Sequence, residues 1–282
     1  MWRHENTDFL MLDKIPILAK ETGIAVYDFR FRDYFPCHSI MDAVDQPVLL
    51  RVGGISDYSD IASMLNERGF RLLLSEQEHD RASLLENWYP LLEKLTPYSV
   101  TYEQFPPLEI VLQDFSFPVF IKGNRQTNHH KKSQCIINNP DMFRRLASEW
   151  QKEKYLHWQK IAVREYVPLR IVDDVSFPNM LPFSYEFRVF FWKQQMVGCG
   201  KYWCLGQDYI LLEEDKEQAL GVAQKAACIL NVPFLAVDIA KTQQEEWIVV
   251  EVNDGQESGY AGVNALSLWS NIIIAEQGKD TV

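Results

Sequence analysis

Three oxygen-bearing side chains near the end of the chain have types and spacing that suit a divalent cation. Asp238 lies in the segment FLAVDIA, and Glu251 and Asn253 lie at positions i and i+2 of the segment WIVVEVN. Because side chains alternate between the faces of a strand, Glu251 and Asn253 project from one face. A turn between the segments places Asp238 opposite or diagonal to Glu251, about 5 to 8 Å away. Two carboxylates and an amide oxygen suit Mg²⁺ or Mn²⁺, and a solvated hairpin face is the alternative.

A second set of charged residues lies on an earlier predicted hairpin. Glu186 and Arg188 share one face of the segment YEFRVFF, and Lys201 lies in the return segment MVGCGKYW after a turn near residues 193–195. Two glycines in the return strand leave room for a ligand. We therefore expect Arg188 and Lys201 to face a polyanion such as a phosphate chain. A surface ion pair between Glu186 and either basic residue is the alternative.

Two further segments complete the set of candidate binding residues. Lys122 ends the apolar strand FPVFIKG and precedes a polar loop at residues 124–134. Its ammonium either reaches a phosphate or extends to solvent. The segment REYVP ends another strand, where the backbone groups of Glu165, Tyr166 and Val167 are available to bind a planar base.

The elements that must position these residues alternate between strands and helices. In the first part of the chain we predict strands at residues 46–54 and 71–74 and helices at 57–69 and 80–95, forming a small open parallel sheet. The Pro106–Pro107 pair marks a boundary after residue 105. Beyond it we predict strands at 117–123 and 161–167, two long hairpins at 184–203 and 234–253, and a helix at 214–230.

Composition restricts the classes of protein. The chain has 28 basic and 39 acidic residues and a formal charge of −11, which disfavours a surface that coats nucleic acid. Its five scattered cysteines form no CxxC pair and indicate reduced thiols. The sequence lacks a long apolar stretch, so we expect neither a signal peptide nor a membrane span. Together these features predict a cytoplasmic protein.

The order of these motifs resembles the ATP-grasp superfamily. FIKG, REYV, EFRVFF with GCGKYW, AVDIA and VVEVNDGQ follow one another as the nucleotide and metal strands do in that superfamily. The resemblance implies an α/β (α+β) fold of two α+β lobes with the nucleotide between them. It places the ATP-grasp domain at residues 106–282, with lobes at about 106–166 and 167–282, after a small pre-ATP-grasp α/β domain at 1–105. The details are most similar to a bacterial and phage branch with distant similarity to eukaryotic cell-division-cycle ATP-grasp proteins.

The resemblance also implies an activity and roles for the residues. It implies an ATP- and Mg²⁺-dependent (or Mn²⁺-dependent) ligase that joins a carboxylate substrate to an amine or thiol acceptor, including peptides and proteins, through an acyl phosphate. A non-catalytic ATP-binding assembly protein and a kinase-type phosphotransferase are the alternatives. The implied catalytic residues are Arg188 and Lys201, the nucleotide-binding residues are Lys122, Glu165, Tyr166, Val167, Glu186 and Asp238, and the metal ligands are Asp238, Glu251 and Asn253.

The acceptor is expected near the loop that follows the second metal strand. Asp254, Gln256, Glu257 and Ser258 lie just beyond Asn253 and are candidates for acceptor contact. In the first domain, Arg51 is a candidate for substrate contact. The aromatic residues near the N-terminus are more often core than binding residues.

Overall fold

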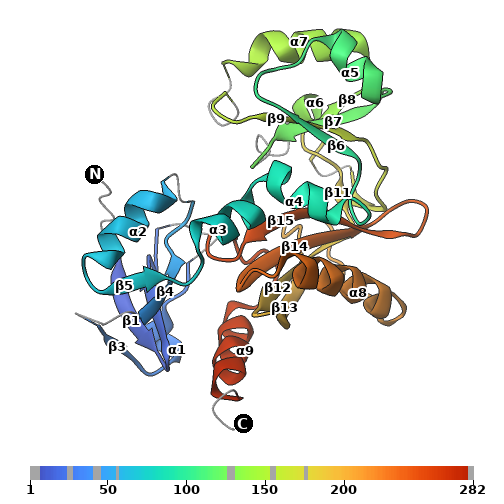
Figure 1. The fold of residues 1–282 in the computed structure, drawn as a ribbon. Helices are drawn as coiled ribbons and strands as arrows, with labels where there is room; N and C mark the ends of the chain where they lie inside the picture. The colour runs from blue at the N-terminus through green and yellow to red at the C-terminus, as the bar shows by residue number, and fades with distance from the viewer. Residues whose placement is uncertain are drawn as a thin grey trace.

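The computed structural model describes most of the chain. The described residues are 7–23, 28–40, 46–54, 57–125, 131–152, 157–174 and 177–278. Three sheets of four or five strands and one two-stranded ribbon organise them, with helices between the sheets and on their faces (Figure 1). The mixed α/β architecture predicted from the sequence is confirmed.

The N-terminal sheet is mixed rather than parallel. Its strand order is β3-β1-β2-β4-β5, in which β2, β4 and β5 are parallel, as predicted, and β1 is antiparallel to both β2 and β3. The difference arises at Asp13, whose positive φ of 52° forms a tight hairpin between β1 and β2, and a short hairpin requires antiparallel strands. The strands are β1 (Asp8–Leu12), β2 (Ile15–Ala19), β3 (Cys37–Ser39), β4 (Gln46–Arg51) and β5 (Phe70–Leu72).

Four helices belong to this part of the chain. They are α1 (Phe31–Tyr34), α2 (Tyr58–Asn66), α3 (Glu76–Ser83) and α4 (Leu85–Leu92). The predicted helix at 57–69 is α2, whose N-cap Asp57 accepts a hydrogen bond from the backbone of Asp60. The single helix predicted at 80–95 is instead two helices. Ser75 and Glu78 form a capping box that starts α3 earlier, and Leu84 adopts an extended conformation between α3 and α4.

The first lobe is a four-stranded antiparallel sheet with its own apolar core. The strand order is β6-β9-β7-β8, and α5 and α7 pack together over it. The elements are β6 (Ser99–Tyr102), α5 (Leu108–Asp114), β7 (Val119–Gly123), α6 (Lys132–Cys135), β8 (Ile136–Ile137), α7 (Pro140–Trp150) and β9 (Ile161–Glu165). Strand β6 precedes the boundary predicted at residue 105, yet it pairs along its length with β9. The last strand of the N-terminal sheet, β5, ends at Leu72.

The second lobe contains both predicted hairpins. Its sheet has the order β13-β12-β14-β15, and α8 covers the face opposite the first lobe (Figure 1). Helix α8 packs through the small side chains Ala219, Ala223, Ala226 and Ala227, which allow close approach to the sheet. The elements are β10 (Ile171–Asp173), β11 (Phe183–Ser184), β12 (Glu186–Trp192), β13 (Gln195–Lys201), α8 (Glu213–Leu230), β14 (Phe234–Lys241), β15 (Trp247–Asp254) and α9 (Ala265–Gln277).

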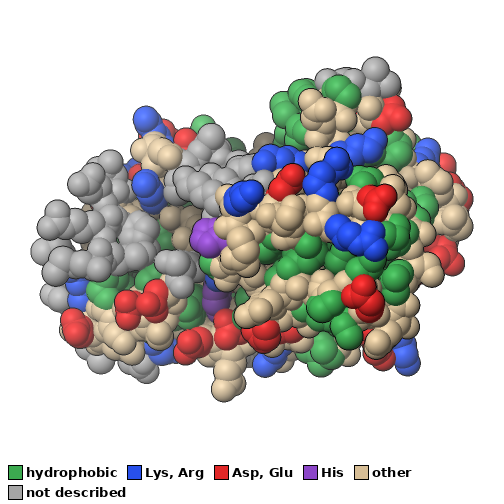
Figure 2. Space-filling view, turned by 90° about the horizontal axis from the view of Figure 1, so that it is seen from above, with side chains coloured by type: hydrophobic (Ala, Val, Ile, Leu, Met, Phe, Trp, Pro, Cys, Tyr) green, Lys and Arg blue, Asp and Glu red, His purple; other side chains and the backbone are tan. Residues whose placement is uncertain are grey.

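Two surface properties bear on the excluded classes of protein. On the face shown in Figure 2, basic and acidic side chains are interspersed and do not form a continuous basic area. Within the described residues, no helix is long and apolar enough to cross a membrane.

Candidate functional site

A cleft between the two lobes brings together residues from most of the predicted motifs. The first lobe contributes Lys122 from β7 and the segment Glu165–Val167 that follows β9, and the second lobe contributes Glu186 from β12 and Glu251 from β15. The lining is otherwise largely apolar and includes Phe120, Ile136, Leu181, Trp203, Ile248 and Val250. A concave, mostly apolar site with a few converging charged groups is typical of a small-molecule pocket.

An ion pair between Lys122 and Glu251 connects the lobes inside the cleft. The ammonium of Lys122 is buried and donates to the carboxylate of Glu251. Burial alone opposes ionisation of Glu251, but Lys122 lowers the pKa of this carboxyl below its ordinary value. Both groups therefore stay charged, and they neutralise each other until a ligand with its own charges enters.

A second buried ion pair lies next to the cleft within the sheet of the second lobe. Arg188 on β12 lies directly opposite Asp238 on β14, and its Nε and Nη2 donate to the two carboxylate oxygens at 2.8 and 2.7 Å. Its Nη1 donates to the carbonyl of Gly259 at 2.9 Å, and its guanidinium lies over the ring of Tyr202. Burial would lower the pKa of Arg188, but Asp238 raises it above its ordinary value, so the guanidinium stays charged.

The three predicted metal ligands share one face of this sheet. Asp238 is directly opposite Glu251, and Asn253 is opposite Ala236, which lies on the same face as Asp238. Beside Glu251, the ladder is interrupted by a β-bulge, because Ile239 pairs with Val249 and leaves Val250 as an additional residue. A hydrogen bond with the Asn253 side chain helps to lower the pKa of Glu251.

The donor set is compatible with a hard divalent cation. It consists of carboxylate and amide oxygens, the ligands that Mg²⁺ prefers, on two paired strands at the edge of the cleft. Among the described residues no three His, Cys, Asp or Glu side chains form a metal cluster, so the amide of Asn253 is needed as a third ligand. The Lys122 and Arg188 cations presently neutralise the two carboxylates.

Glu186 is buried in the cleft among other acids. Its carboxyl accepts a hydrogen bond from the Ser184 hydroxyl at 2.8 Å. Burial, and then the nearby charge of Asp238, raise its pKa to about 8. At neutral pH the folded protein therefore holds Glu186 mostly as a neutral acid, which can donate a hydrogen bond as well as accept one.

The structure does not bring Lys201 together with Arg188 as predicted. Arg188 lies opposite Gly200, whereas Lys201 lies opposite Phe187 and therefore on the other face of the sheet. The cause is a β-bulge: Phe191 pairs with Met196 but Phe190 pairs with Gly198, so one residue is inserted into β13. Without it, Lys201 would lie opposite Glu186, on the face of Arg188. Lys201 instead forms an ion pair with Asp208.

Arg164, which the sequence did not single out, lines the cleft and joins the lobes. It precedes the 165–167 segment and is buried, and burial lowers its pKa to about 10. Its Nη1 donates to the carbonyl of Val250 at 2.8 Å, and its Nη2 donates to the Thr96 hydroxyl at 2.7 Å. Thr96 in turn donates to the carbonyl of Val249. Arg164 and Thr96 therefore hold the bulge that precedes Glu251.

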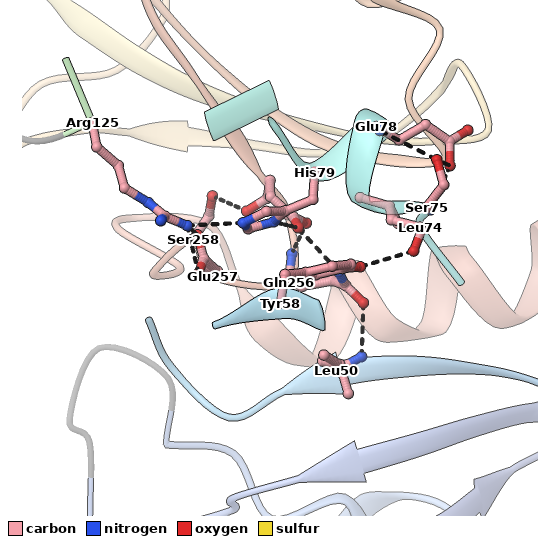
Figure 3. A network of polar contacts seen from close by, with 12 residues as sticks. Leu50, Tyr58, Leu74, Ser75, Glu78, His79, Arg125, Gln256, Glu257 and Ser258 are labelled. Carbon is pink, nitrogen blue, oxygen red and sulfur yellow. Dashed lines mark hydrogen bonds and ion pairs between the residues drawn. The ribbon is translucent and has the colours of Figure 1, made fainter. Parts of the chain in front are cut away.

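The loop after β15 is fixed by the N-terminal part of the chain. Arg51, predicted to contact substrate, is buried and donates to the carbonyls of Gly255 and Ser258, both at 2.8 Å. Gln256 accepts from the backbone of Leu50 at 2.9 Å (Figure 3). Gln256, Ser258 and Asp254 are also buried, so they organise this loop from within. Glu257 is the only one of the four predicted acceptor residues in the loop that the structure leaves partly exposed.

His79 is a second residue that the sequence gave no reason to select. Its Nδ1 lies 2.8 Å from the carboxylate of Asp254, and its ring stacks on Tyr58 with centroids 4.2 Å apart. Its partner is 175 residues away in the sequence, so no local pattern could have indicated the contact.

Comparison with known proteins agrees with this fold. A family model for an ATP-grasp domain, described as family 3 of its clade, matches residues 112–272, which is more than half of the chain. The fold and the interlobe cleft are those of an ATP-grasp protein. The chain belongs to this family of ATP-grasp domains.

Solved structures share the fold at low sequence identity. A RimK domain ATP-grasp protein from Sphaerobacter thermophilus has a TM-score of 0.53 and 12% identity over 80% of this chain and 79% of its own. VanG D-Ala:D-Ser ligase from Enterococcus faecalis has a TM-score of 0.56 and 12% identity over 81% and 72%. D-alanine–D-alanine ligase from Bacillus anthracis, complexed with ATP, has a TM-score of 0.53 and 13% identity over 78% and 76%. No curated protein matches the sequence.

Proposed function

We propose that the protein is an ATP-dependent ligase that joins a carboxylate to an amine through an acyl phosphate. The observation that carries this proposal is the ion pair between Lys122 and Glu251, which opposes a cation of one lobe to an acid of the other inside the shared cleft. A nucleotide with its metal presents complementary charges to both groups. Membership of the ATP-grasp family and the similarity to two ligases of known structure support the proposal.

The nucleotide is proposed to lie along the cleft with its base at the 165–167 segment. Glu165, Tyr166 and Val167 line the cleft on the side of the first lobe, together with apolar side chains suited to a planar ring. Lys122 and Arg188 are the cations available to the phosphates. Glu186, as a neutral acid, is suited to donate a hydrogen bond to a ribose or phosphate oxygen without electrostatic repulsion.

Asp238, Glu251 and Asn253 are proposed to hold Mg²⁺ or Mn²⁺. When bound, the cation supplies charge neutralisation to the phosphate oxygens, which lowers their repulsion of an anionic nucleophile. The chain's own cations then have a defined role. Lys122 releases Glu251, and Arg188 keeps Asp238 oriented through its two hydrogen bonds.

The proposed reaction has two balanced steps. One oxygen of the substrate carboxylate forms a bond to the γ-phosphorus as the bond to the β–γ bridging oxygen breaks, which gives an acyl phosphate and ADP. The amine then attacks the acyl carbon, inorganic phosphate leaves, and the amine loses a proton. A carboxylate needs no general base in the first step, and positioning and electrostatics carry the catalysis.

The test is to incubate the protein with ATP, Mg²⁺ and pairs of ¹⁸O-labelled acids and amines. The proposal predicts ADP release that requires an acid, and transfer of one ¹⁸O atom from the acid to inorganic phosphate. ADP release without transfer of label would contradict an acyl phosphate.

One observation favours an alternative function, a nucleotide-dependent binding protein. Arg188 engages both oxygens of Asp238, and Lys122 engages Glu251, so protein cations already compensate both carboxylates. A protein of this kind would bind ATP without turnover across the whole set of acids and amines. A phosphorylated product that persists without an amine would instead indicate a kinase-type phosphotransferase.

The domain boundary is proposed to lie after β5 rather than at residue 105. The N-terminal sheet ends at Leu72, and α3 already packs on β15 of the second lobe. Residues up to about 74 then form the domain that precedes the ATP-grasp domain. Through Leu50 and Arg51 this domain fixes the loop after β15, and we propose that it contributes to the choice of substrate.

A further inference from the structure

A second pair of opposite charges joins the lobes beyond the Lys122–Glu251 pair. Arg125 follows Lys122 by three residues at the end of β7, and Glu257 follows Glu251 by six residues after β15. The Nη2 atom of Arg125 lies 3.1 and 3.0 Å from the two carboxylate oxygens of Glu257. Along both strands, therefore, the direction away from the 165–167 segment passes first one interlobe ion pair and then another.

A buried relay holds the guanidinium of Arg125 in place. The same Nη2 lies 2.9 Å from Nε2 of His79, and Nδ1 of His79 lies 2.8 Å from the carboxylate of Asp254 (Figure 3). Because arginine can only donate, Nε2 must be the acceptor and the proton of the ring belongs on Nδ1, toward Asp254. His79 and Asp254 are buried, and Tyr58 stacks on the imidazole, so the relay is rigid.

The Arg125–Glu257 pair is geometrically incomplete. Arg188 uses two nitrogens on two oxygens of Asp238, in the side-by-side arrangement that binds a carboxylate best. Arg125 uses a single nitrogen for both oxygens of Glu257, and within the described part of the chain its Nε and Nη1 make no hydrogen bond. The pair is also partly exposed, with 21% of the Arg125 side chain and 13% of the Glu257 side chain accessible. A carboxylate that approaches the remaining edge of this guanidinium can form the better pair.

We propose that Arg125, oriented by His79, is a binding site for a carboxylate group of the substrate, and that Glu257 occupies this site in its absence. The inference rests on the proposed function, because the nucleotide position defines which end of the cleft receives the substrate. With the base at 165–167 and the phosphates at Lys122, the substrate must arrive from the side on which Arg125 lies. Glu257 then acts as an internal competitor that the substrate carboxylate displaces.

The test uses succinate as the probe and the protein saturated with Mg²⁺ and a non-hydrolysable ATP analogue. Glu257→Gln removes the competing charge while keeping the shape of the side chain, and Arg125→Gln/Glu257→Gln additionally removes the guanidinium. By calorimetry, Glu257→Gln is expected to bind succinate about tenfold more tightly than the unaltered protein, and the double variant at least tenfold more weakly than Glu257→Gln. Equal affinities in the single and double variants would overturn the proposal.

Two further measurements separate this site from the nucleotide site. Arg125→Gln should leave the affinity for the ATP analogue unchanged, and a loss of tenfold or more would show that Arg125 binds phosphate instead. Inorganic phosphate should bind Glu257→Gln more weakly than succinate, and the reverse order would also contradict the proposal. If Glu257→Gln unfolds, Glu257→Ala replaces it. Absence of nucleotide binding in the unaltered protein would refute the proposed function and not this site alone.

Discussion

Arg188 and Asp238 lie directly opposite each other on antiparallel strands and share two hydrogen bonds of 2.8 and 2.7 Å. The pair is largely withdrawn from water, with 10% of the arginine side chain and 1% of the aspartate side chain accessible. A cross-strand pair of this kind fixes the orientation of a proposed metal ligand before any ligand is present. It also makes the two residues depend on each other for stability.

We expect Arg188→Met to destabilise the protein by about 3 to 5 kcal/mol, because it leaves the charge of Asp238 buried and uncompensated. The double variant Arg188→Met/Asp238→Leu should recover most of this loss, since it removes both charges. Urea unfolding measures both. Lys193→Met is the matched control, since its partly exposed pair with Glu276 is worth at most about 1 kcal/mol. A double variant no more stable than Arg188→Met would contradict the pairing.

Lys122→Met is expected to weaken ATP binding at least tenfold, because it removes a buried cation that faces the proposed phosphate position. Titration with a fluorescent ATP analogue measures the affinity. Lys160→Met is the control: Lys160 belongs to the same lobe and pairs with Glu86 and Glu103, but it does not line the cleft. Equal losses in the two variants would indicate a general electrostatic effect and would reject a specific role for Lys122.

Glu186 predicts a particular dependence of stability on pH. Its folded-state pKa is raised from an ordinary value of 4.5 to about 8, so between these pH values the folded state binds a proton that the unfolded state releases. The contribution of Glu186 to stability is therefore full below pH about 4.5 and is lost as pH rises toward 8. Glu186→Gln, which cannot ionise, should gain stability relative to the unaltered protein over this window, by up to a few kcal/mol. Metal-free urea unfolding at pH 5 and 8.5 measures the difference, and a pH-independent difference would contradict the neutral acid.

Arg164→Met should loosen the bulge in β15, because it leaves the carbonyl of Val250 without its buried donor. A loss of about 1 to 3 kcal/mol is expected from the unsatisfied group alone. Amide hydrogen exchange should become faster around residues 249–251 and should not change in α7. Arg144→Met, which removes an exposed helical ion pair, is the control. Unchanged exchange in β15 would show that Arg164 does not hold the bulge.

The sequence was informative where strand periodicity alone decides the geometry. The i, i+2 spacing of Glu251 and Asn253, and a turn between the two strands, suffice to place both residues near Asp238, and the register agrees. The same reasoning failed for Lys201. A single inserted residue in β13 reverses the face of every residue beyond it, and a bulge among the apolar and glycine residues of that strand has no sequence signature.

Contacts between distant segments were beyond prediction from sequence for a related reason. Arg51 and Gln256 each carry a polar group suited to a ligand, but the docking of the N-terminal sheet uses these groups on backbone atoms. Arg164 and His79 acquire their roles only when strands far apart in the chain meet. Local patterns thus predicted the elements and one corner of the site, while tertiary packing determined which polar residues remain available to a ligand.

A crystal structure with ADP and Mn²⁺ tests the proposed metal–nucleotide site most directly, because Mn²⁺ is located by its anomalous scattering. The expected result is nucleotide between the lobes and a Mn²⁺ peak about 2.1 Å from oxygens of Glu251 and Asn253, with Asp238 contributing directly or through water. The peak should disappear in Glu251→Ala. A peak held by other residues, or one that persists unchanged in both Glu251→Ala and Asp238→Ala, would contradict the assignment.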